Sequence, residues 1–185
     1  MNMKNFEQIK EEIEKIITNY DKRDLTHAQG TLSWLLKIKP DADEVTQIAA
    51  FAHDIERCYR KDKGAPTYLI TEEFDNYLRY KKLHEETGAD IVRRIFERYG
   101  ESSDDVKRVV FLISNHENGQ GESVYVCDAD SLSYLTDNFD GYLKIHGPVR
   151  ARKKLDWMFD RMSEKGKKLG LEFYNKALEK IKAKI

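Results

Sequence analysis

The sequence predicts an all-α protein, and three observations carry that prediction. Glycine and proline are scarce, with 10 and 3 residues among 185. Between these breaks, apolar residues recur every three or four positions, which is the period of an amphipathic helix. The hydrophobic fraction of 40% is enough to fill the core of one domain of this length. We therefore expect a single helical domain over residues 1–185.

The N-terminal part of the chain contains three predicted helices. The first runs over residues 6–17, and the second over residues 25–36 until Pro40 ends it. Asp41 or Asp43 caps the third, because short acidic side chains accept hydrogen bonds from the free amides of a first turn. This third helix is almost wholly apolar, so we expect it to be deeply buried.

The rest of the chain is also expected to be helical, apart from two connections. The segment from Cys58 to Thr71 has no apolar period and is predicted to be a loop, and Gly119 and Gly121 indicate a turn. Helices are predicted over residues 72–99, 103–113, 124–135, 141–145, 148–161 and 165–184. The last helix is basic and amphipathic and serves as a core or dimer element, so a homodimer is one expectation.

Charge and segment length exclude several classes of protein. The chain has 32 basic and 33 acidic side chains, a balance that argues against a nucleic acid polymer as partner. No apolar run approaches the roughly 18 residues of a membrane span, and the N-terminus lacks a signal-peptide pattern. The two cysteines lie far apart, in no paired spacing. We expect a cytoplasmic protein without a membrane partner.

Four of the five histidines, together with several acids, are the most informative feature of the sequence. The relevant segments are Thr26-His27-Ala28-Gln29-Gly30, His53-Asp54, His84-Glu85-Glu86-Thr87-Gly88, His116-Glu117 and Asp128-Ala129-Asp130. The pair His53-Asp54 follows five apolar residues, and a buried carboxylate costs several kcal/mol unless a cation or partner compensates it. Imidazole and carboxylate together suit Mn, Fe, Co, Ni and Zn. A metal is the favoured compensator, and a buried His–Asp hydrogen bond is the alternative.

The order of His27, the pair His53-Asp54 and a later aspartate resembles the HD-domain superfamily of metal-dependent phosphohydrolases. The resemblance covers about residues 25–135. It implies an HD-domain helical bundle on which the C-terminal helices, residues 148–184, pack. It also implies a metal ion bound by the first histidine, the His-Asp pair and the distal aspartate.

Two residues compete for the role of the distal aspartate. In the family this residue is followed by a small residue and a leucine, and Leu132 stands two positions after Asp130. Asp130 is therefore the better match and Asp128 the fallback. Because side chains at i and i+2 of a helix point about 200° apart, only one of them is expected to face the metal.

Two further histidines extend the resemblance to family members with two metal ions. His84 opens a segment similar to their His-x-x-x-Gly motif, and His116 lies in a turn similar to their His-His-Glu turn, with Asn115 in place of one histidine. No Gly-Tyr-Pro follows, which argues against the HD-GYP phosphodiesterases. The resemblance implies two divalent ions bridged by Asp54, from Mn, Fe, Co, Ni, Zn or Mg. Neither histidine has an obvious acid partner for a structural role. The alternative is one ion, with His84 and His116 binding substrate.

Basic residues near these motifs are candidates for phosphate binding. Arg57 stands where HD proteins often carry a Lys or Glu that helps catalysis, and its planar donors can clamp a phosphate. We therefore assign Asp54 and Arg57 as catalytic and Arg57, Lys81 and Lys82 as substrate-binding. The basic segment 150–168 is a further candidate rim, although a solvated face is the simpler interpretation. Glu56 is a weaker candidate for an acid behind the ligands.

The predicted function follows from this ligand set. A pair of divalent ions activates water and neutralises a phosphate under attack, so we expect a phosphohydrolase acting on a nucleotide or similar small phosphorylated compound. One alternative is a diiron HD-type oxygenase that cleaves a C–C or C–P bond in a small substrate. Another is a non-catalytic sensor that binds a nucleotide.

Overall fold

The structure is a computed structural model that describes the backbone of residues 3–62 and 74–184, and the side chains of these residues except 60–62 and 74–79. Within these residues every regular element is a helix, which confirms the all-α prediction. The elements are α1 (Phe6–Thr18), α2 (Lys22–Ile38), α3 (Glu44–Ala52), α4 (Glu56–Asp62), α5 (Phe74–Arg98), α6 (Ser103–Ser114), η1 (Gly121–Ser123), α7 (Val124–Ser133), η2 (Tyr134–Asn138), α8 (Phe139–Asp160) and α9 (Glu164–Lys182).

The first three helices agree with the apolar pattern and with the capping rules. In α1 the isoleucines at 9, 13 and 17 form one buried stripe. Asp43, rather than Asp41, caps α3, because its side chain accepts a hydrogen bond of 2.9 Å from the backbone N–H of Thr46. Every residue of α3 from Val45 to Ala52 except Gln47 is buried, as its apolar sequence predicts.

The predicted loop from Cys58 to Thr71 is wrong at its start. Residues 58–62 belong to α4, and residues 63–71 lie outside the described part of the chain. The apolar pattern does not predict α4, because this helix is short and mainly charged. Its buried Cys58 belongs to the hydrophobic core and the helix packs against α5, so tertiary contacts position it.

The predicted gap between the helices over 124–135 and 141–145 is also absent. A turn of π-helix, η2, carries the chain from α7 into α8 without a break. The predicted interruption before Pro148 is confirmed, because Gly147 has φ +76° and kinks α8 there. This left-handed conformation is one that glycine adopts readily. Gly119 and Gly121 also have positive φ, in the predicted turn after α6.

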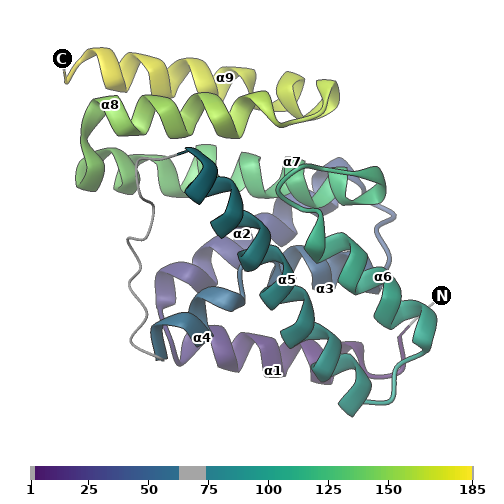
Figure 1. Ribbon diagram of the computed structural model, residues 1–185. Coiled ribbons are helices and arrows are strands. Elements are labelled where there is room, and N and C mark those ends of the chain that lie inside the picture. The colour runs from purple at the N-terminus through teal and green to yellow at the C-terminus, as the bar shows by residue number, and fades with distance from the viewer. Residues whose placement is uncertain (1–2, 63–73, 185) are drawn as a thin grey trace.

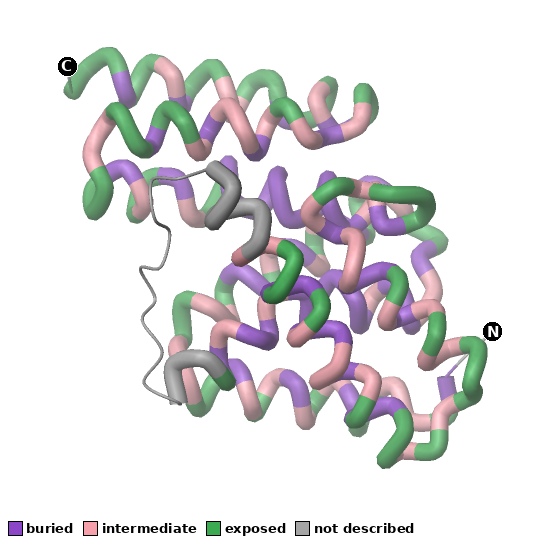
Figure 2. Tube along the Cα trace, in the orientation of Figure 1, coloured by how far each residue is buried: buried purple, intermediate pink, exposed green. Residues whose placement is uncertain are grey.

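The helices are arranged as a bundle flanked by a helical hairpin (Figure 1). The hairpin consists of α9 and the part of α8 beyond the kink, which lie side by side, and α7 and η2 separate it from most of the other helices. Buried segments concentrate where α2, α3, α5, α6 and α7 meet, whereas the hairpin is exposed along its outer side (Figure 2). The buried apolar side chains form one cluster that reaches from Ile9 in α1 to Ile181 in α9.

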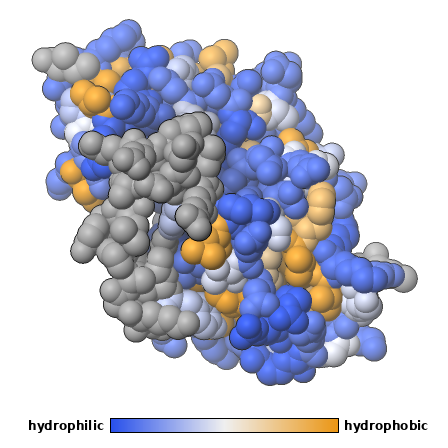
Figure 3. Space-filling model, viewed as in Figure 1, coloured by the Kyte–Doolittle hydropathy of each residue, from blue (hydrophilic) through white to orange (hydrophobic). Residues whose placement is uncertain are grey.

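One face of the molecule is seen in Figure 3, and it is mainly polar. On the face in Figure 3 hydrophilic residues predominate and the apolar ones form separate patches. Among the described residues, no helix combines the length and apolarity needed to cross a membrane. The cytoplasmic location and the homodimer stay predictions.

Candidate metal centre

The six residues predicted to bind metal lie together inside the bundle, although they come from five parts of the chain. The fold places His27 in α2, His53 and Asp54 directly after α3, His84 in α5, His116 shortly after α6, and Asp130 in α7. The four histidines and Asp130 are buried, and Asp54 is nearly so. Unrelated core histidines have no reason to converge in this way, so the cluster is a candidate site.

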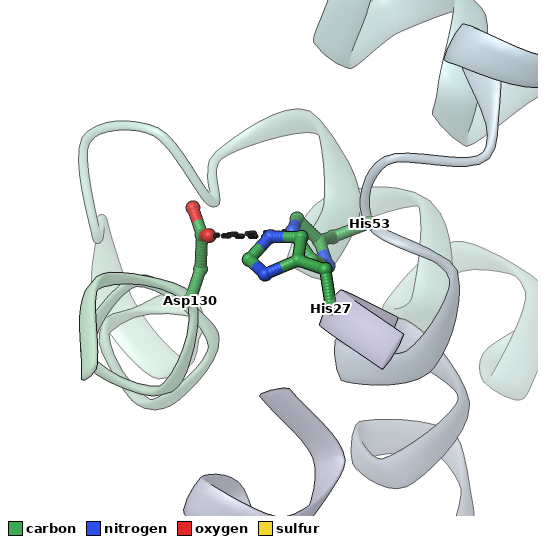
Figure 4. A group of neighbouring side chains, drawn as sticks. All are labelled: His27, His53 and Asp130. Carbon is green, nitrogen blue, oxygen red and sulfur yellow. Dashed lines mark ion pairs between the residues drawn. The ribbon is translucent and has the colours of Figure 1, made fainter. Parts of the chain in front are cut away.

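Three of these residues, His27, His53 and Asp130, form a first triad (Figure 4). Asp130 Oδ1 lies 3.0 Å from His27 Nε2 and 3.5 Å from His53 Nε2. Two ligand atoms that each stand about 2.1 Å from one ion are roughly 3.0–3.4 Å apart in octahedral or tetrahedral geometry. The spacing in this triad is close to that of neighbouring ligands around one divalent ion.

The other three residues, Asp54, His84 and His116, form a second triad. Asp54 Oδ1 lies 3.0 Å from His84 Nε2. The second oxygen of the same carboxylate, Oδ2, lies 3.6 Å from His27 Nε2 and 3.5 Å from His53 Nε2 in the first triad. Asp54 therefore has one oxygen beside each triad.

Each of the four imidazoles is anchored through its Nδ1 atom. Nδ1 lies 3.1 Å from Ser133 Oγ in His27, 2.9 Å from the Ala50 carbonyl in His53, 2.9 Å from Glu56 Oε2 in His84 and 2.7 Å from the Ile113 carbonyl in His116. An oxygen acceptor at Nδ1 favours the tautomer with its proton there, which leaves a lone pair on Nε2. This arrangement is typical of metal-binding histidines.

Four of the ligand atoms in the cluster lack hydrogen bonds to other described residues, although one of them, Asp54 Oδ2, forms an ion pair with Arg57. Across the described part of the chain, the Nε2 atoms of His53, His84 and His116 and Oδ2 of Asp54 are buried without a hydrogen-bond partner. Buried polar atoms are rarely left in this state, because an unsatisfied group costs about 1–3 kcal/mol. A cation bound between the imidazole lone pairs and the carboxylates satisfies all four atoms. The donor set therefore fits a divalent metal.

Electrostatics in the cluster also favours added positive charge. Burial alone would raise the pKa of Asp54 and Asp130, but Arg57 and Arg161 hold both pKa values well below the ordinary 3.8. Burial opposes protonation of His53 too, yet the two carboxylates raise its pKa to about 9. For His116 burial prevails and lowers the pKa to about 3. The ionised carboxylates attract a cation, and a metal ion meets that demand without a proton.

Two glycines allow the helices to approach one another at this site. A Cβ atom at Gly30 in α2 would lie 2.6 Å from Ser133 Oγ, so the absence of a side chain lets Ser133 reach His27. A Cβ atom at Gly88 in α5 would lie 3.5 Å from the His53 carbonyl oxygen, so a side chain larger than alanine would meet the backbone there. Both glycines belong to the segments that the histidine motifs singled out.

The two competing aspartates of α7 point to different partners. Asp130 joins the first triad, whereas Asp128 accepts hydrogen bonds of 2.8 and 2.5 Å from the backbone N–H and the hydroxyl of Ser163, at the start of α9. The expected opposition of residues two apart on a helix accounts for this. The fallback residue Asp128 is therefore not part of the cluster.

The expectation that His84 has no acid partner is wrong. Glu56 is buried and its Oε2 accepts from His84 Nδ1, which is the supporting role that the sequence favoured only weakly. The sequence gives Glu56 little weight because, two positions after Asp54, its side chain points away from that residue. Its partner is instead His84, which α5 brings to it from another part of the chain.

Sequence reasoning missed Arg161 and Glu117 as residues of the site. Arg161 is the residue after α8, its side chain is 7% exposed, and it donates to Asp130, to Glu117 and, at 2.9 Å, to Ser131 Oγ. In the sequence Arg161 is one of many basic residues in the segment 150–168. The simpler interpretation of such a run is a set of solvent-exposed side chains, so the run itself does not mark Arg161 as buried. Its only sequence signal is its place between the apolar residues Met158 and Met162.

The predicted phosphate-binding residues have different surroundings. Arg57 forms an ion pair of 2.8 Å with Asp54 Oδ2 and its side chain is 34% exposed, so it lies between the cluster and the surface. Lys81 pairs with Glu117, next to His116. Lys82 pairs with Glu86 on the surface and its side chain is 61% exposed, so its predicted role gains no support from its contacts.

Comparison with known proteins gives one match. A family model described as "Domain of unknown function (DUF4202)" matches residues 3–183. No curated protein and no solved structure matches the chain.

Proposed function

We propose that this chain, which belongs to the DUF4202 family, is a metal-dependent phosphohydrolase with an HD-type helical bundle. Its substrate in this proposal is a phosphate ester, a nucleotide or a similar small phosphorylated compound. The observation that carries the proposal is the convergence of six buried or nearly buried residues in two triads, in which three imidazole Nε2 atoms lack a hydrogen-bond partner among the described residues. Their order along the chain is the order that the HD resemblance implies.

In this proposal the first triad holds one divalent ion and the second triad holds another. His27, His53 and Asp130 bind the first ion, His84 and His116 bind the second, and Asp54 serves both because each of its oxygens lies beside one triad. Divalent ions bound there supply a hydroxide at neutral pH and neutralise the oxygens of a phosphate under attack.

The protein itself positions these groups and receives the substrate. The Nδ1 anchors on Ser133, Ala50, Glu56 and Ile113 hold the four rings in place, which lowers the cost of ordering them when metal binds. Arg57 touches Asp54 and reaches toward the surface, so its remaining guanidinium donors are placed to bind a phosphate oxygen. Asp54 and Arg57 are the residues to which we assign catalysis.

The decisive experiment measures metal content and reaction class together. The purified protein is loaded anaerobically with Mn²⁺ and assayed against a panel of phosphomonoesters, phosphodiesters and nucleotides. We expect phosphate release without oxygen. Activity that requires iron and oxygen, with no phosphate release from the panel, would establish the diiron oxygenase instead, since the same imidazole and carboxylate donors suit iron. Binding of a nucleotide without turnover would favour the sensor.

Variants test the assignment of residues. Asp54→Ala should abolish hydrolysis while helicity by circular dichroism is retained, and Asp90→Asn on the exposed side of α5 should leave both unchanged. The double variant His84→Ala, His116→Ala should lose about one equivalent of metal. His146→Ala is the matched control, because His146 packs on the Tyr142 ring and belongs to neither triad. An unchanged stoichiometry in the double variant would reassign His84 and His116 to substrate binding.

A further inference from the structure

Three basic side chains gather around one aromatic ring beside the metal centre. Lys81 Nζ from α5 lies 4.8 Å from the centre of the Trp157 ring, Lys154 Nζ from α8 lies 4.5 Å from it, and the guanidinium carbon of Arg161 lies 4.4 Å from it. We call Lys81, Lys154, Arg161, Trp157 and the neighbouring Glu117 the Trp157 cluster. It brings three cations from two distant parts of the chain into contact with the same ring.

Negative charge in the Trp157 cluster does not balance these cations. Glu117 is the acid of the cluster, and it pairs with both Lys81 and Arg161. Arg161 also pairs with Asp130, a residue of the first triad. The contacts of Lys154 within the described residues are with two aromatic rings, Trp157 and, at 5.6 Å, Tyr134. Lys154 therefore has no carboxylate partner there.

The charged form of Lys154 is destabilised in this cluster unless a nearby anion compensates its charge. Lys154 is partly buried and stands near two other cations, and both conditions destabilise its charged form. Accordingly, burial and the neighbouring Lys81 lower the pKa of Lys154 well below its ordinary 10.5. Contact with an aromatic ring recovers part of that cost, about 0.5–2 kcal/mol. An anion bound beside Lys154 would offset that cost more fully, because it carries a full negative charge.

The position of the Trp157 cluster indicates what such an anion belongs to. The guanidinium of Arg161 pairs with both Asp130 and Glu117, so the Trp157 cluster adjoins the first triad directly through Arg161. An anionic group bound at Lys154 is thus close enough to belong to the same small molecule as a group bound at the triads. A phosphate is the anion that Lys and Arg bind together most readily.

We propose that Lys154, together with Lys81 and Arg161, forms an anion subsite that receives a second phosphate of the substrate. The inference deepens the proposed function and rests on it for the first phosphate, which the triads bind. It specifies the substrate class as compounds with two or more phosphates, such as nucleoside diphosphates or bisphosphates, in preference to simple monoesters. The competing view is that Lys154 only packs on Trp157 and Tyr134.

Calorimetric titration of Mn²⁺-loaded protein with inorganic pyrophosphate tests the subsite, with the same Mn²⁺ concentration in cell and syringe. Lys154→Met keeps the length and the apolar stem of the side chain and removes its charge. We expect it to weaken pyrophosphate binding about 10- to 100-fold, the range for a hydrogen bond to a charged group. Orthophosphate, which needs only the triads, should lose much less affinity. Lys153→Met is the matched control, since Lys153 is the exposed neighbour on the same helix.

A charge-retaining variant and a protection experiment distinguish an anion subsite at Lys154 from a lysine that only packs on aromatic rings. Lys154→Arg should keep most of the pyrophosphate affinity, because it keeps the charge. Wild-type affinity in Lys154→Met would overturn the subsite. If Lys154→Met fails to fold, acetylation of wild-type protein followed by peptide mass spectrometry replaces it. Pyrophosphate should then protect Lys154 and not Lys153, and equal labelling of Lys154 with and without pyrophosphate would overturn the proposal.

Failure of the subsite is distinguishable from failure of the proposed function. If the protein hydrolyses phosphoesters but Lys154→Met changes neither pyrophosphate affinity nor the ratio of kcat/KM between diphosphate and monophosphate substrates, only the subsite is wrong. If no phosphoester is hydrolysed but pyrophosphate binding depends on Lys154, the anion site stands and the hydrolytic function falls.

Discussion

The helices before η2 and the α8–α9 hairpin contribute to the candidate site in different ways. All six candidate ligands come from the region between α2 and α7, where each imidazole is anchored by a carbonyl, hydroxyl or carboxylate oxygen. The hairpin region contributes none of them, but it supplies Lys154 and Arg161. The first region determines where ligand atoms lie, and the second adjusts the charge around them.

Helix α7 belongs to both regions and illustrates the division. Asp130 on one side of α7 faces the triad, and Asp128 on the other side binds the first turn of α9 through Ser163. Ser163 in turn accepts from the backbone N–H of Gly166, 3.1 Å away. Two carboxylates on a single helix thus have unrelated tasks, one in the site and one in the attachment of the hairpin. Separate effects of their substitution are the clearest way to test this comparison.

The largest effect is expected for Asp130→Ala. Loss of a ligand should weaken metal binding at the first triad by more than the roughly 10- to 100-fold that loss of a supporting residue causes. Metal content after dialysis against a weak chelator measures this. Asp128→Ala is the control on the same helix and should keep its metal. Equal metal loss in both variants would contradict the division of roles.

Glu56→Gln should have the next largest effect, within the region that supplies the ligands. The amide retains the shape of the carboxylate but weakens the hold on His84 Nδ1, so metal affinity of the second triad should fall about 10- to 100-fold. Competition with a fluorescent chelator measures the affinity of each site. Glu86→Gln, in the surface pair with Lys82, should change nothing. An unaltered second site in Glu56→Gln would make Glu56 a structural residue.

Asp128→Ala should reveal the role of the hairpin in stability. It leaves the backbone N–H and hydroxyl of Ser163 without their acceptor, and we expect a loss of about 2–3 kcal/mol in the free energy of unfolding. Urea denaturation followed by circular dichroism gives this value. If the folded Asp128→Ala variant also lost its metal, attachment of the hairpin would be shown to shape the triads as well.

Asp43 provides the smallest and most local test, at the cap of α3. Burial alone would raise the pKa of Asp43, but the N–H of Thr46 and the guanidinium of Arg108 lower it below 3.8. A carboxylate whose pKa is lower in the folded state stabilises it above the unfolded pKa and loses this contribution as the pH falls. Asp43→Asn should therefore cost about 1 kcal/mol or less near neutral pH. The difference in urea midpoint between Asp43→Asn and wild type should shrink as the pH falls below 3.8. A difference that does not change with pH would exclude the charge of the Asp43 carboxylate as its cause.

Local patterns in the sequence were sufficient for most helices, whereas the six candidate ligands were identified through the resemblance to the HD-domain superfamily. Apolar periodicity predicts α1, α2, α3 and α6, because each buries one continuous stripe or, in α3, nearly its whole surface. It does not reveal α4, which is short and mainly charged and whose buried positions depend on tertiary packing, including its contact with α5. The π-helical link η2 is missed because Asp137, Asn138 and Gly141 are typical turn residues, whereas packing of Tyr134 and Leu135 keeps the chain helical.

The sequence by itself determined that the pair His53-Asp54, at the end of an apolar helix, requires compensation, and the family resemblance added His27, His84, His116 and one of two aspartates. Tertiary structure decided which groups compensate one another. It selected Asp130 over Asp128, placed Glu56 behind His84, and brought Arg161 into the site from a basic segment. The physical reason is that helical periodicity fixes the face on which a side chain lies, whereas its partner on that face depends on how helices distant in sequence cross.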